Sequence, residues 1–334
     1  MFSKNVAVDL GTANILVYVA GEGIVLREPS VAAVSTEGHR RVLAVGEEAS
    51  RMLGRTPEGM EAVRPLRDGV IADSKVTGQM LRAFVKKAVK KKSIFSSFNM
   101  VICVPCFITE SEKRAVQDAA RQSGARQCYI AEEPVAAAIG ADLPFNDPRG
   151  SMVVDIGGGT TEIAVVSVGG VVASKSLRVG GVKMDEAIVT YMKKQYNVAI
   201  GDKTAEELKV TIGSAMDSKD VSSMMVRGRD VVSGMPATIE VTSREVSYAL
   251  NGLIVEMVAE IHKVLEQTPP ELAGDVLQYG IVLTGGGALL RNLDERITYE
   301  TGIPTYIAEY PLDCVALGAG RMVEELDSLK RTAR

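Results

Sequence analysis

The chain has 334 residues, of which 46% are hydrophobic and 24% charged, and its formal net charge is −4. This composition is typical of a folded globular protein of about two domains, and the charge gives no reason to expect nucleic-acid binding. No run of about 18 apolar residues predicts a transmembrane helix. The first predicted strand follows Met-Phe-Ser-Lys-Asn directly, so we expect no signal peptide.

Strand and helix patterns alternate along the chain, which predicts a layered α/β fold. Strands are predicted at Val6–Leu10, Ile15–Ala20, Met100–Val104, Met152–Ile156, Glu162–Val168, Val171–Leu177 and Gly280–Thr284. Helices are predicted at Thr77–Lys91, Thr109–Ser123, Val135–Gly140, Met184–Tyr196, Thr204–Gly213 and Ser243–Gln267. Thr109 is a plausible N-cap because Glu112 three residues later would complete a capping box.

Two segments that lie far apart, Val6–Asn14 and Val153–Thr161, share the same pattern. Each has an apolar strand, an Asp-x-Gly turn with small polar residues, and a second strand, and Asp9 and Asp155 lie 146 positions apart. Such a turn suits a phosphate and its metal, because glycines let backbone N–H groups approach an anion and the carboxylate faces the cation. One copy alone is better explained by a plain β-hairpin. Two copies suggest two domains that close on one nucleotide.

Three further features could contribute to a nucleotide site. Gly285, Gly286 and Gly287 follow a predicted strand and precede helix-forming residues 288–293, a junction that lets backbone approach a ribose or base. Glu206 and Lys209 share a helix face, although a surface ion pair would explain them as well. Glu133 begins a predicted helix, where an acid is also favoured by the helix dipole alone.

The order of these segments resembles the superfamily of actin, heat-shock chaperones and sugar kinases. Finer features, among them Glu28-Pro-Ser-Val31, Asp68–Asp73, Ile200–Glu206 and Thr268–Leu272, resemble MreB-type bacterial actins over essentially the whole chain. The resemblance implies a two-lobed actin-like α/β fold of duplicated ribonuclease-H-like domains with two small inserted subdomains. The implied large subdomains are 1–32, 74–148 and 314–334 in lobe I and 149–182 and 243–313 in lobe II. The implied small subdomains are 33–73 and 183–242.

The same resemblance implies roles for individual residues in binding ATP and Mg²⁺. Asp9 and Asp155 would hold the metal, partly through water, because Mg²⁺ sheds its hydration shell reluctantly. Glu133 would position or activate the water that attacks the γ-phosphate, and Thr161 would help to hold that water. Glu206, Lys209 and Gly285–Gly287 would border the nucleoside. The phosphates would be wrapped by two sets of residues: Gly11, Thr12, Ala13 and Asn14, and Gly157, Gly158, Gly159 and Thr160.

Two positions depart from the family pattern. Val182 stands where MreB-like chains usually carry Asp, which puts one polar contact near the phosphates in doubt but leaves the metal carboxylates untouched. Arg27 stands where these chains usually carry an amide residue, and we attach no functional consequence to it.

A basic and apolar patch follows the helix predicted at 77–91. Lysines 86, 87, 90, 91 and 92 precede Ile94 and Phe95, and such a combination suits an anionic membrane surface with an apolar anchor. The family binds membrane through a hydrophobic loop at this place, so Ile94 and Phe95 are the predicted membrane contacts. A solvated helix end before a strand is the alternative explanation.

The four cysteines are consistent with a reducing cytoplasm. Cys103-Val-Pro-Cys106 has the form of a redox dithiol, but its place at the end of an apolar strand favours a structural role. A zinc site is not expected, because the chain has no second Cys-x-x-Cys and only two histidines.

These features lead us to expect a slow ATPase that forms filaments, as paired protofilaments, on the inner face of the cell membrane. The family resemblance adds an anionic membrane and cell-wall elongation proteins such as MreC and RodZ as partners, and control of rod shape as the role. A chaperone ATPase is one alternative, but its peptide-binding domain would have to follow where this chain ends. A metabolite kinase is another, but it needs a substrate-deprotonating carboxylate and a sugar pocket that we do not find.

Overall fold

The computed structural model describes residues 5–37, 40–89, 98–217 and 220–332. The chain folds as two compact units, the first formed by Met1–Phe145 with Leu312–Arg334 and the second by Asn146–Pro311. Each unit has its own large apolar cluster. Both clusters are dominated by aliphatic side chains, as a chain without tryptophan requires.

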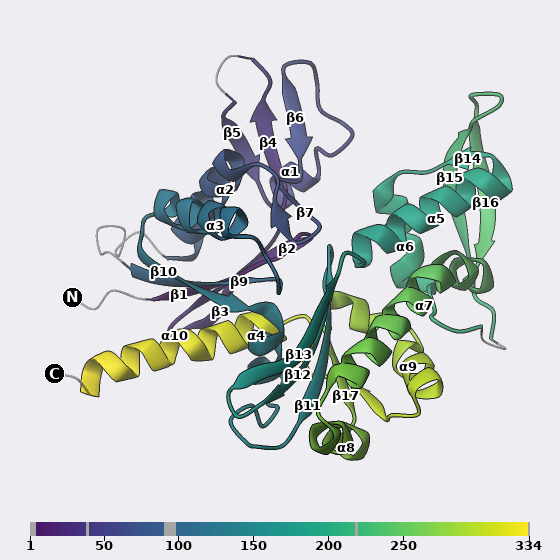
Figure 1. Ribbon diagram of the computed structural model, residues 1–334. Helices are drawn as coiled ribbons and strands as arrows, with labels where there is room; N and C mark the ends of the chain where they lie inside the picture. The colour runs from purple at the N-terminus through teal and green to yellow at the C-terminus, as the bar shows by residue number, and fades with distance from the viewer. Residues whose placement is uncertain (1–4, 38–39, 90–97, 218–219, 333–334) are drawn as a thin grey trace. The chain divides into compact units, whose positions relative to one another are not determined.

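The first unit is built on a five-stranded sheet with the strand order β10-β9-β1-β2-β3. Its strands are β1 (Val6–Leu10), β2 (Asn14–Val19), β3 (Gly23–Pro29), β9 (Phe98–Val104) and β10 (Ala125–Glu132). Its helices are α2 (Ser74–Ala88), α3 (Glu110–Ser123), α4 (Glu133–Gly140) and α10 (Cys314–Thr332). Figure 1 shows α2 and α3 on one face of this sheet and α4 and α10 on the other.

A smaller sheet lies within the first unit, with the order β5-β4-β6. It contains β4 (Ala32–Ser35), β5 (Val42–Val45) and β6 (Met60–Val63), and the short helix α1 (Glu47–Ser50) packs beside it. A two-stranded hairpin follows, made of β7 (Leu66–Arg67) and β8 (Val70–Ile71).

The second unit is built on a five-stranded sheet with the order β13-β12-β11-β17-β18. Its strands are β11 (Ser151–Ile156), β12 (Thr161–Ser167), β13 (Gly170–Leu177), β17 (Ile281–Thr284) and β18 (Thr305–Ile307). A three-stranded sheet contains β14 (Val198–Ala199), β15 (Ser223–Asp230) and β16 (Pro236–Thr242). The helices are α5 (Gly181–Tyr196), α6 (Asp202–Ile212), α7 (Ser243–Gln267), α8 (Pro270–Tyr279) and α9 (Leu293–Thr301), with a 3-10 turn at Gly286–Leu289.

The two large sheets share one topology. In the first sheet the antiparallel pairs are β1–β2 and β2–β3, and the parallel pairs are β1–β9 and β9–β10. In the second sheet the corresponding antiparallel pairs are β11–β12 and β12–β13, and the parallel pairs are β11–β17 and β17–β18. The first strand of each sheet is therefore central, and the Asp-x-Gly turn follows it in both units. This equivalence is the structural basis of the sequence similarity between Val6–Asn14 and Val153–Thr161.

Several predicted elements are confirmed. Strand β1 and helix α7 have the predicted bounds. The capping box at the start of α3 is present, with the Thr109 N–H donating to Glu112 Oε2 at 2.6 Å and the Glu112 N–H donating to Thr109 Oγ1 at 3.2 Å.

Several predicted helix starts are wrong. Helix α5 begins at Gly181 rather than Met184, and α6 begins at Asp202 rather than Thr204. Helix α2 begins at Ser74 rather than Thr77, because the Asp73 side chain caps it by accepting a hydrogen bond from the Val76 N–H at 3.0 Å. The helix expected at residues 288–293 is replaced by the 3-10 turn, and α9 begins only at Leu293. Leu290, which is extended, and Asn292, with a φ of 59°, separate the two elements, and a left-handed residue cannot continue a helix.

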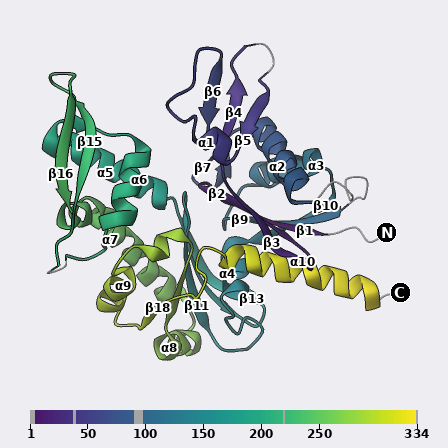
Figure 2. The same ribbon diagram turned by 180° about the vertical axis from the view of Figure 1, so that it is seen from behind.

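Helices α4 and α10 cross at close range within the first unit, and Figure 2 shows them side by side. Glycines at the crossing make this possible, since a Cβ on Gly140 would overlap the carbonyl of Cys314 and a Cβ on Gly318 would overlap that of Ala136. The crossing fixes the position of α4, whose first residue is Glu133.

Candidate nucleotide-binding site

The turn after β1 is held by its own backbone and by Ser30. Asp9 is half-buried near the end of β1, where it lies opposite Leu16 of β2 and Cys103 of β9. A Cβ on Gly11 would lie 2.6 Å from the carbonyl oxygen of Asn14, so the tightness of the turn requires glycine. The Ser30 hydroxyl donates to the Gly11 carbonyl at 2.5 Å, and the Ser30 N–H donates to the Ala13 carbonyl at 2.9 Å.

The Thr12 side chain ties the same turn to the β7–β8 hairpin. Its hydroxyl oxygen accepts a hydrogen bond from the Gly69 N–H at 3.0 Å, and the residue is only 6% exposed. A hydroxyl that accepts one hydrogen bond still has its own proton to donate. Thr12 can therefore accept a hydrogen bond from the hairpin and donate one to an anion at the turn. Ser30 and Gly69 were not predicted as supports of this turn, because both are remote from it in sequence.

Glu133 lies at the same end of the sheet as Asp9, where the parallel strands β1, β9 and β10 end. Asp9 of β1 and Ala131 of β10 both pair with Cys103 of β9, the strand between them. Adjacent strands are about 4.8 Å apart, so β1 and β10 are separated by about 10 Å there. Glu133 is 7% exposed and Glu132 is exposed. The role predicted for Glu133 thus falls on the buried one of these two neighbouring glutamates, at a helix N-terminus whose dipole favours an anion.

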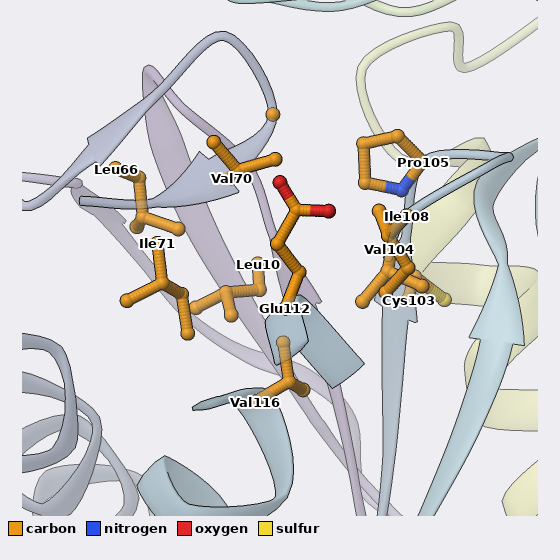
Figure 3. A pocket seen from close by; sticks show the side chains of 11 residues that line it. Leu10, Leu66, Val70, Ile71, Cys103, Val104, Pro105, Ile108, Glu112 and Val116 are labelled. Atoms are coloured by element: carbon orange, nitrogen blue, oxygen red, sulfur yellow. The ribbon is translucent and has the colours of Figure 1, made fainter. Parts of the chain in front are cut away.

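An apolar pocket lies beside the first turn, and Figure 3 shows the Glu112 carboxylate among its aliphatic walls. Glu112 is already engaged in the capping box of α3, where its Oε2 accepts from the Thr109 hydroxyl at 2.8 Å. The pocket was not predicted, because its walls come from separate segments that no single motif joins. Its lining includes Leu10, Leu66, Val70, Ile71, Pro105 and Glu112.

In the second unit, Asp155 is a buried carboxylate held by a neighbouring strand. It is 5% exposed, and Oδ1 accepts a hydrogen bond from the Thr284 hydroxyl at 2.7 Å. The two residues are register partners on the parallel strands β11 and β17. Burial raises the pKa of Asp155 to about 6, and the hydrogen bond from Thr284 opposes the rise. A nearby cation would favour the ionised carboxylate, so the residue suits a metal site. Thr284 was not predicted as its partner.

The glycine turn after β11 is bonded to the start of α5. The Gly157 N–H donates to the Thr160 carbonyl at 2.8 Å, while the Gly157 carbonyl accepts from the Gly181 N–H at 3.0 Å. The Gly158 carbonyl accepts from the Val182 N–H at 2.9 Å. Val182, the departure from the family pattern, therefore lies directly against the turn and contributes its backbone there.

Thr161 begins β12 and is fully buried. Its hydroxyl donates to the Val179 carbonyl at 2.7 Å. Because that bond uses the only hydroxyl proton, Thr161 can interact with a water only by accepting a hydrogen bond from it.

Lys209 forms an ion pair with Asp185 that was not predicted from the sequence. Its Nζ lies 2.7 Å from Asp185 Oδ1, with the two side chains 14% and 13% exposed, and it donates to the Gly181 carbonyl at 2.9 Å. Lys209 thus joins α6 to the start of α5, beside the glycine turn. Glu206 is exposed one turn earlier on α6. Burial raises the pKa of Asp185 to about 6, and the charge of Lys209 opposes the rise. A buried pair to Asp185 replaces the surface pair with Glu206 that was considered from sequence.

The third glycine cluster packs on the end of β11. Gly285 has a φ of 78° and donates its N–H to the Pro311 carbonyl at 2.8 Å. A Cβ on Gly285 would overlap the Ile156 carbonyl, and a Cβ on Gly287 would overlap the Ile156 side chain. The second turn and the predicted nucleoside segment therefore lie side by side within this unit, together with Asp155 and the Asp185–Lys209 pair.

The remaining sequence features have mixed outcomes. Ile94 and Phe95 lie outside the described residues. Arg27 is exposed and forms an ion pair with Asp313. The cysteines are free, with Cys103, Cys106 and Cys314 buried, so the 103–106 pair is not a disulfide here. Among the described residues no group of three or more His, Cys, Asp or Glu could hold a metal, and no helix is long and apolar enough to cross a bilayer.

A duplicated five-stranded unit, with an Asp-x-Gly turn after the central first strand of each copy, defines the actin-like class of fold. A solved structure, MreB5 of Spiroplasma citri bound to AMPPNP, matches with a TM-score of 0.93 and 36% identity over 100% of both chains. The expected actin-like fold is confirmed.

The sequence comparisons give the family. The family model "MreB/Mbl protein" matches residues 3–331. The cell shape-determining protein Mbl of Bacillus subtilis (strain 168) is 47% identical over 331 residues, 99% of each chain. The cell shape-determining protein MreB of Escherichia coli (strain K12) is 49% identical over 330 residues, 98% of this chain and 95% of that protein. The chain belongs to the MreB/Mbl family.

Proposed function

We propose that the chain is an ATP-dependent, filament-forming bacterial actin. The observation that carries this proposal is the pair of equivalent Asp-x-Gly turns, one in each unit, in a chain of the MreB/Mbl family. Two comparisons support it, since the MreB5 relative was solved with AMPPNP, an ATP analogue, and the relatives Mbl and MreB are named for determining cell shape.

Each unit contributes its own nucleotide-binding residues in this proposal. In the first unit Gly11–Asn14 bind phosphate oxygens, with Ser30 and Gly69 keeping the turn in place. In the second unit Gly157–Thr160 bind the phosphates from a turn that α5 supports. Glu206, Lys209 and Gly285–Gly287 border the nucleoside. The donors are mostly backbone N–H groups, which suit a polyanion.

Asp9 and Asp155 fit a Mg²⁺ ion that keeps most of its waters. Mg²⁺ with a nucleotide is usually bound by one or two carboxylates and the phosphates, not by a full protein cage, and the buried Asp155 is a carboxylate that a cation would stabilise. When bound, the ion neutralises phosphate charge. Thr284 orients Asp155 for this contact through the 2.7 Å hydrogen bond.

In this proposal Glu133 binds and orients the water that attacks the γ-phosphate. Phosphoryl transfer requires mainly positioning and charge neutralisation, so one carboxylate together with one metal ion would be sufficient for slow hydrolysis. The carboxylate of Glu133 accepts a hydrogen bond from the water and orients it toward the γ-phosphate. Thr161 accepts a second hydrogen bond from that water, since its own proton is donated to Val179.

The decisive experiment measures nucleotide binding, phosphate release and light scattering of the full chain with Mg²⁺-ATP. We expect scattering to rise with ATP, and Glu133→Ala to retain nucleotide binding but lose phosphate release by about 100-fold. The exposed neighbour provides the control, because Glu132→Ala should leave release near the parental rate. Hydrolysis that persists in Glu133→Ala would refute the role of this residue. Scattering that never rises at any concentration would refute filament formation.

We further propose that filaments lie on the anionic inner face of the cell membrane and organise cell-wall synthesis and rod shape. Lys86 is exposed near the end of α2 and supplies part of the basic surface, whereas the neighbouring Lys87 pairs with Glu28. The predicted apolar contacts, Ile94 and Phe95, follow in the chain. The family resemblance adds MreC and RodZ as candidate partners. Co-sedimentation of an Ile94→Ser/Phe95→Ser variant with anionic liposomes tests membrane contact, and undiminished binding would refute it.

A further inference from the structure

Strand β10 is an edge of the five-stranded sheet in the first unit. Within the part of the chain that the structure describes, it pairs with β9 alone, and Figure 1 shows it beside α3. Its residues Arg126, Gln127 and Tyr129 are exposed. An edge strand offers unpaired backbone N–H and C=O groups on which another extended chain can add.

The first part of this edge is irregular. The register with β9 steps from Ala125 opposite Phe98 to Gln127 opposite Asn99, which leaves Arg126 as an extra residue in a bulge. A bulge changes the direction of a side chain and twists the strand, and natural proteins often use it near binding sites. Arg126 is thereby set apart from the regular alternation of β10.

A polar groove, which we call the β10 groove, runs between this edge and the end of α3. It is lined by Gln117, Arg121, Arg126, Gln127, Cys128 and Tyr129. This lining contains two guanidinium groups and no carboxylate. The Cys128 thiol adds no negative charge at neutral pH, because burial raises its pKa to about 11. The charge of the groove is therefore positive, in a chain whose net charge is −4.

The polar groups of the β10 groove have capacity for further hydrogen bonds. Tyr129 donates its hydroxyl to Gln127 Oε1 at 3.0 Å, and the Gln127 amide nitrogen still has hydrogens to donate. Arg121 lies 3.4 Å from Asp118 Oδ1, but both side chains are more than half exposed, at 71% and 59%. Exposed pairs of this kind are weak, so a carboxylate that binds the guanidinium in two places would compete well.

We propose that the β10 groove binds an extended acidic segment of a partner protein, which adds to β10 as a further strand. Backbone hydrogen bonds to the edge would provide affinity, and a carboxylate bound by Arg121 and Arg126 would provide specificity. The exposed Glu132 at the opposite end of β10 repels acids there, so the acidic residues of the partner lie at the Arg126 end. This binding site is independent of the nucleotide and of its hydrolysis.

Selection of a randomised heptapeptide phage library on the full chain tests the proposal. The enriched peptides should be rich in Asp or Glu at one end and poor in proline, because proline cannot donate to a strand edge. The selected peptide, labelled with fluorescein, is then titrated by anisotropy against the parent and the variants. We expect Arg121→Ala/Arg126→Ala to bind about tenfold more weakly, and added salt to weaken binding to the parent.

Arg114→Ala provides the matched control, since Arg114 is an exposed arginine of α3 that does not line the β10 groove. It should change peptide affinity by less than about twofold. Equal thermal melting of the variants and the parent will show that the exposed substitutions leave the fold intact. Failure to enrich acidic peptides, or equal binding by the double variant, would overturn the proposal. Displacement of the peptide by inorganic phosphate at equal concentration would also overturn it.

Discussion

Asp155 combines two properties that oppose each other in a folded protein. Its burial makes ionisation costly and raises its pKa to about 6, while its proposed role requires the charged form. The pKa of Asp155 in the folded protein is above the ordinary value of 3.8, so the free energy of unfolding is highest below about pH 3.8, where the carboxyl is protonated in both states. This contribution to stability is lost as the pH rises through about 6, and the loss amounts to about 3 kcal/mol.

We therefore predict that Asp155→Asn stabilises the nucleotide-free protein at pH 7.5 by about 1–3 kcal/mol, because the amide removes the buried charge and can still accept from Thr284. The same variant should lose Mg²⁺-dependent ATP binding. Urea unfolding at pH 4.5 and 7.5 measures the first effect, with the exposed Asp118→Asn as control. A variant less stable than the parent at pH 7.5 would show that the buried charge is already compensated in the folded protein.

Helices α4 and α10 depend on two glycines that allow their backbones to meet. A Cβ on Gly140 would overlap the Cys314 carbonyl, which is backbone and cannot rotate away. We predict that Gly140→Ala lowers the free energy of unfolding by about 1–3 kcal/mol, the usual cost of overpacking. It should also slow phosphate release, because α4 carries Glu133 at its start.

Gly252 in the middle of α7 provides the control for this prediction. It is exposed and has no atom within 4 Å of an added Cβ, so Gly252→Ala should raise stability by up to about 1 kcal/mol through helix propensity alone. Thermal unfolding of both variants measures the difference. Equal effects of the two substitutions would mean that the crossing of α4 and α10 adapts to an extra methyl group.

Elements whose defining residues are neighbours in the sequence could be predicted, and the others could not. The Asp-x-Gly turns, the Thr109 capping box and α7 were predicted because their residues are adjacent in sequence. Strand β10 was missed because its alternation is mostly polar at an exposed edge. The expected helix at 288–293 failed because Leu290 is extended and Asn292 is left-handed, properties that helix-forming neighbours do not reveal.

The supports of the candidate site were less predictable than its motifs. Thr284, Asp185 and Ser30 act across strand pairs or between helices, at separations that no spacing rule covers. Their contributions depend on which strands are neighbours, and that information comes from the sheet order. The motifs alone indicate the ligand class, whereas the sheets determine which side chains hold each motif in place.

At the scale of the whole molecule, each unit carries an Asp-x-Gly turn, and nucleotide binding should stabilise both turns. A ligand at about 100 times its Kd stabilises the state that binds it by about 2.7 kcal/mol. We predict that Mg²⁺-ATP slows amide hydrogen exchange in residues 9–14 of the first unit and in residues 157–161 of the second at the same ATP concentration. Mass spectrometry of peptides from both segments measures this. Protection confined to one unit would contradict the proposed role of the turn in the other.

The placement of the four cysteines has a practical consequence for following such changes. Cys103, Cys106 and Cys314 are buried, and the half-buried Cys128 has a pKa raised to about 11. Since the thiolate is the reactive species, none of the native sulfurs will compete strongly for a maleimide at neutral pH. A single added cysteine, for example Tyr299→Cys at a position 79% exposed, would then carry one dye per molecule. The proposed filaments could then be followed one at a time by fluorescence microscopy, with the native cysteines left in place.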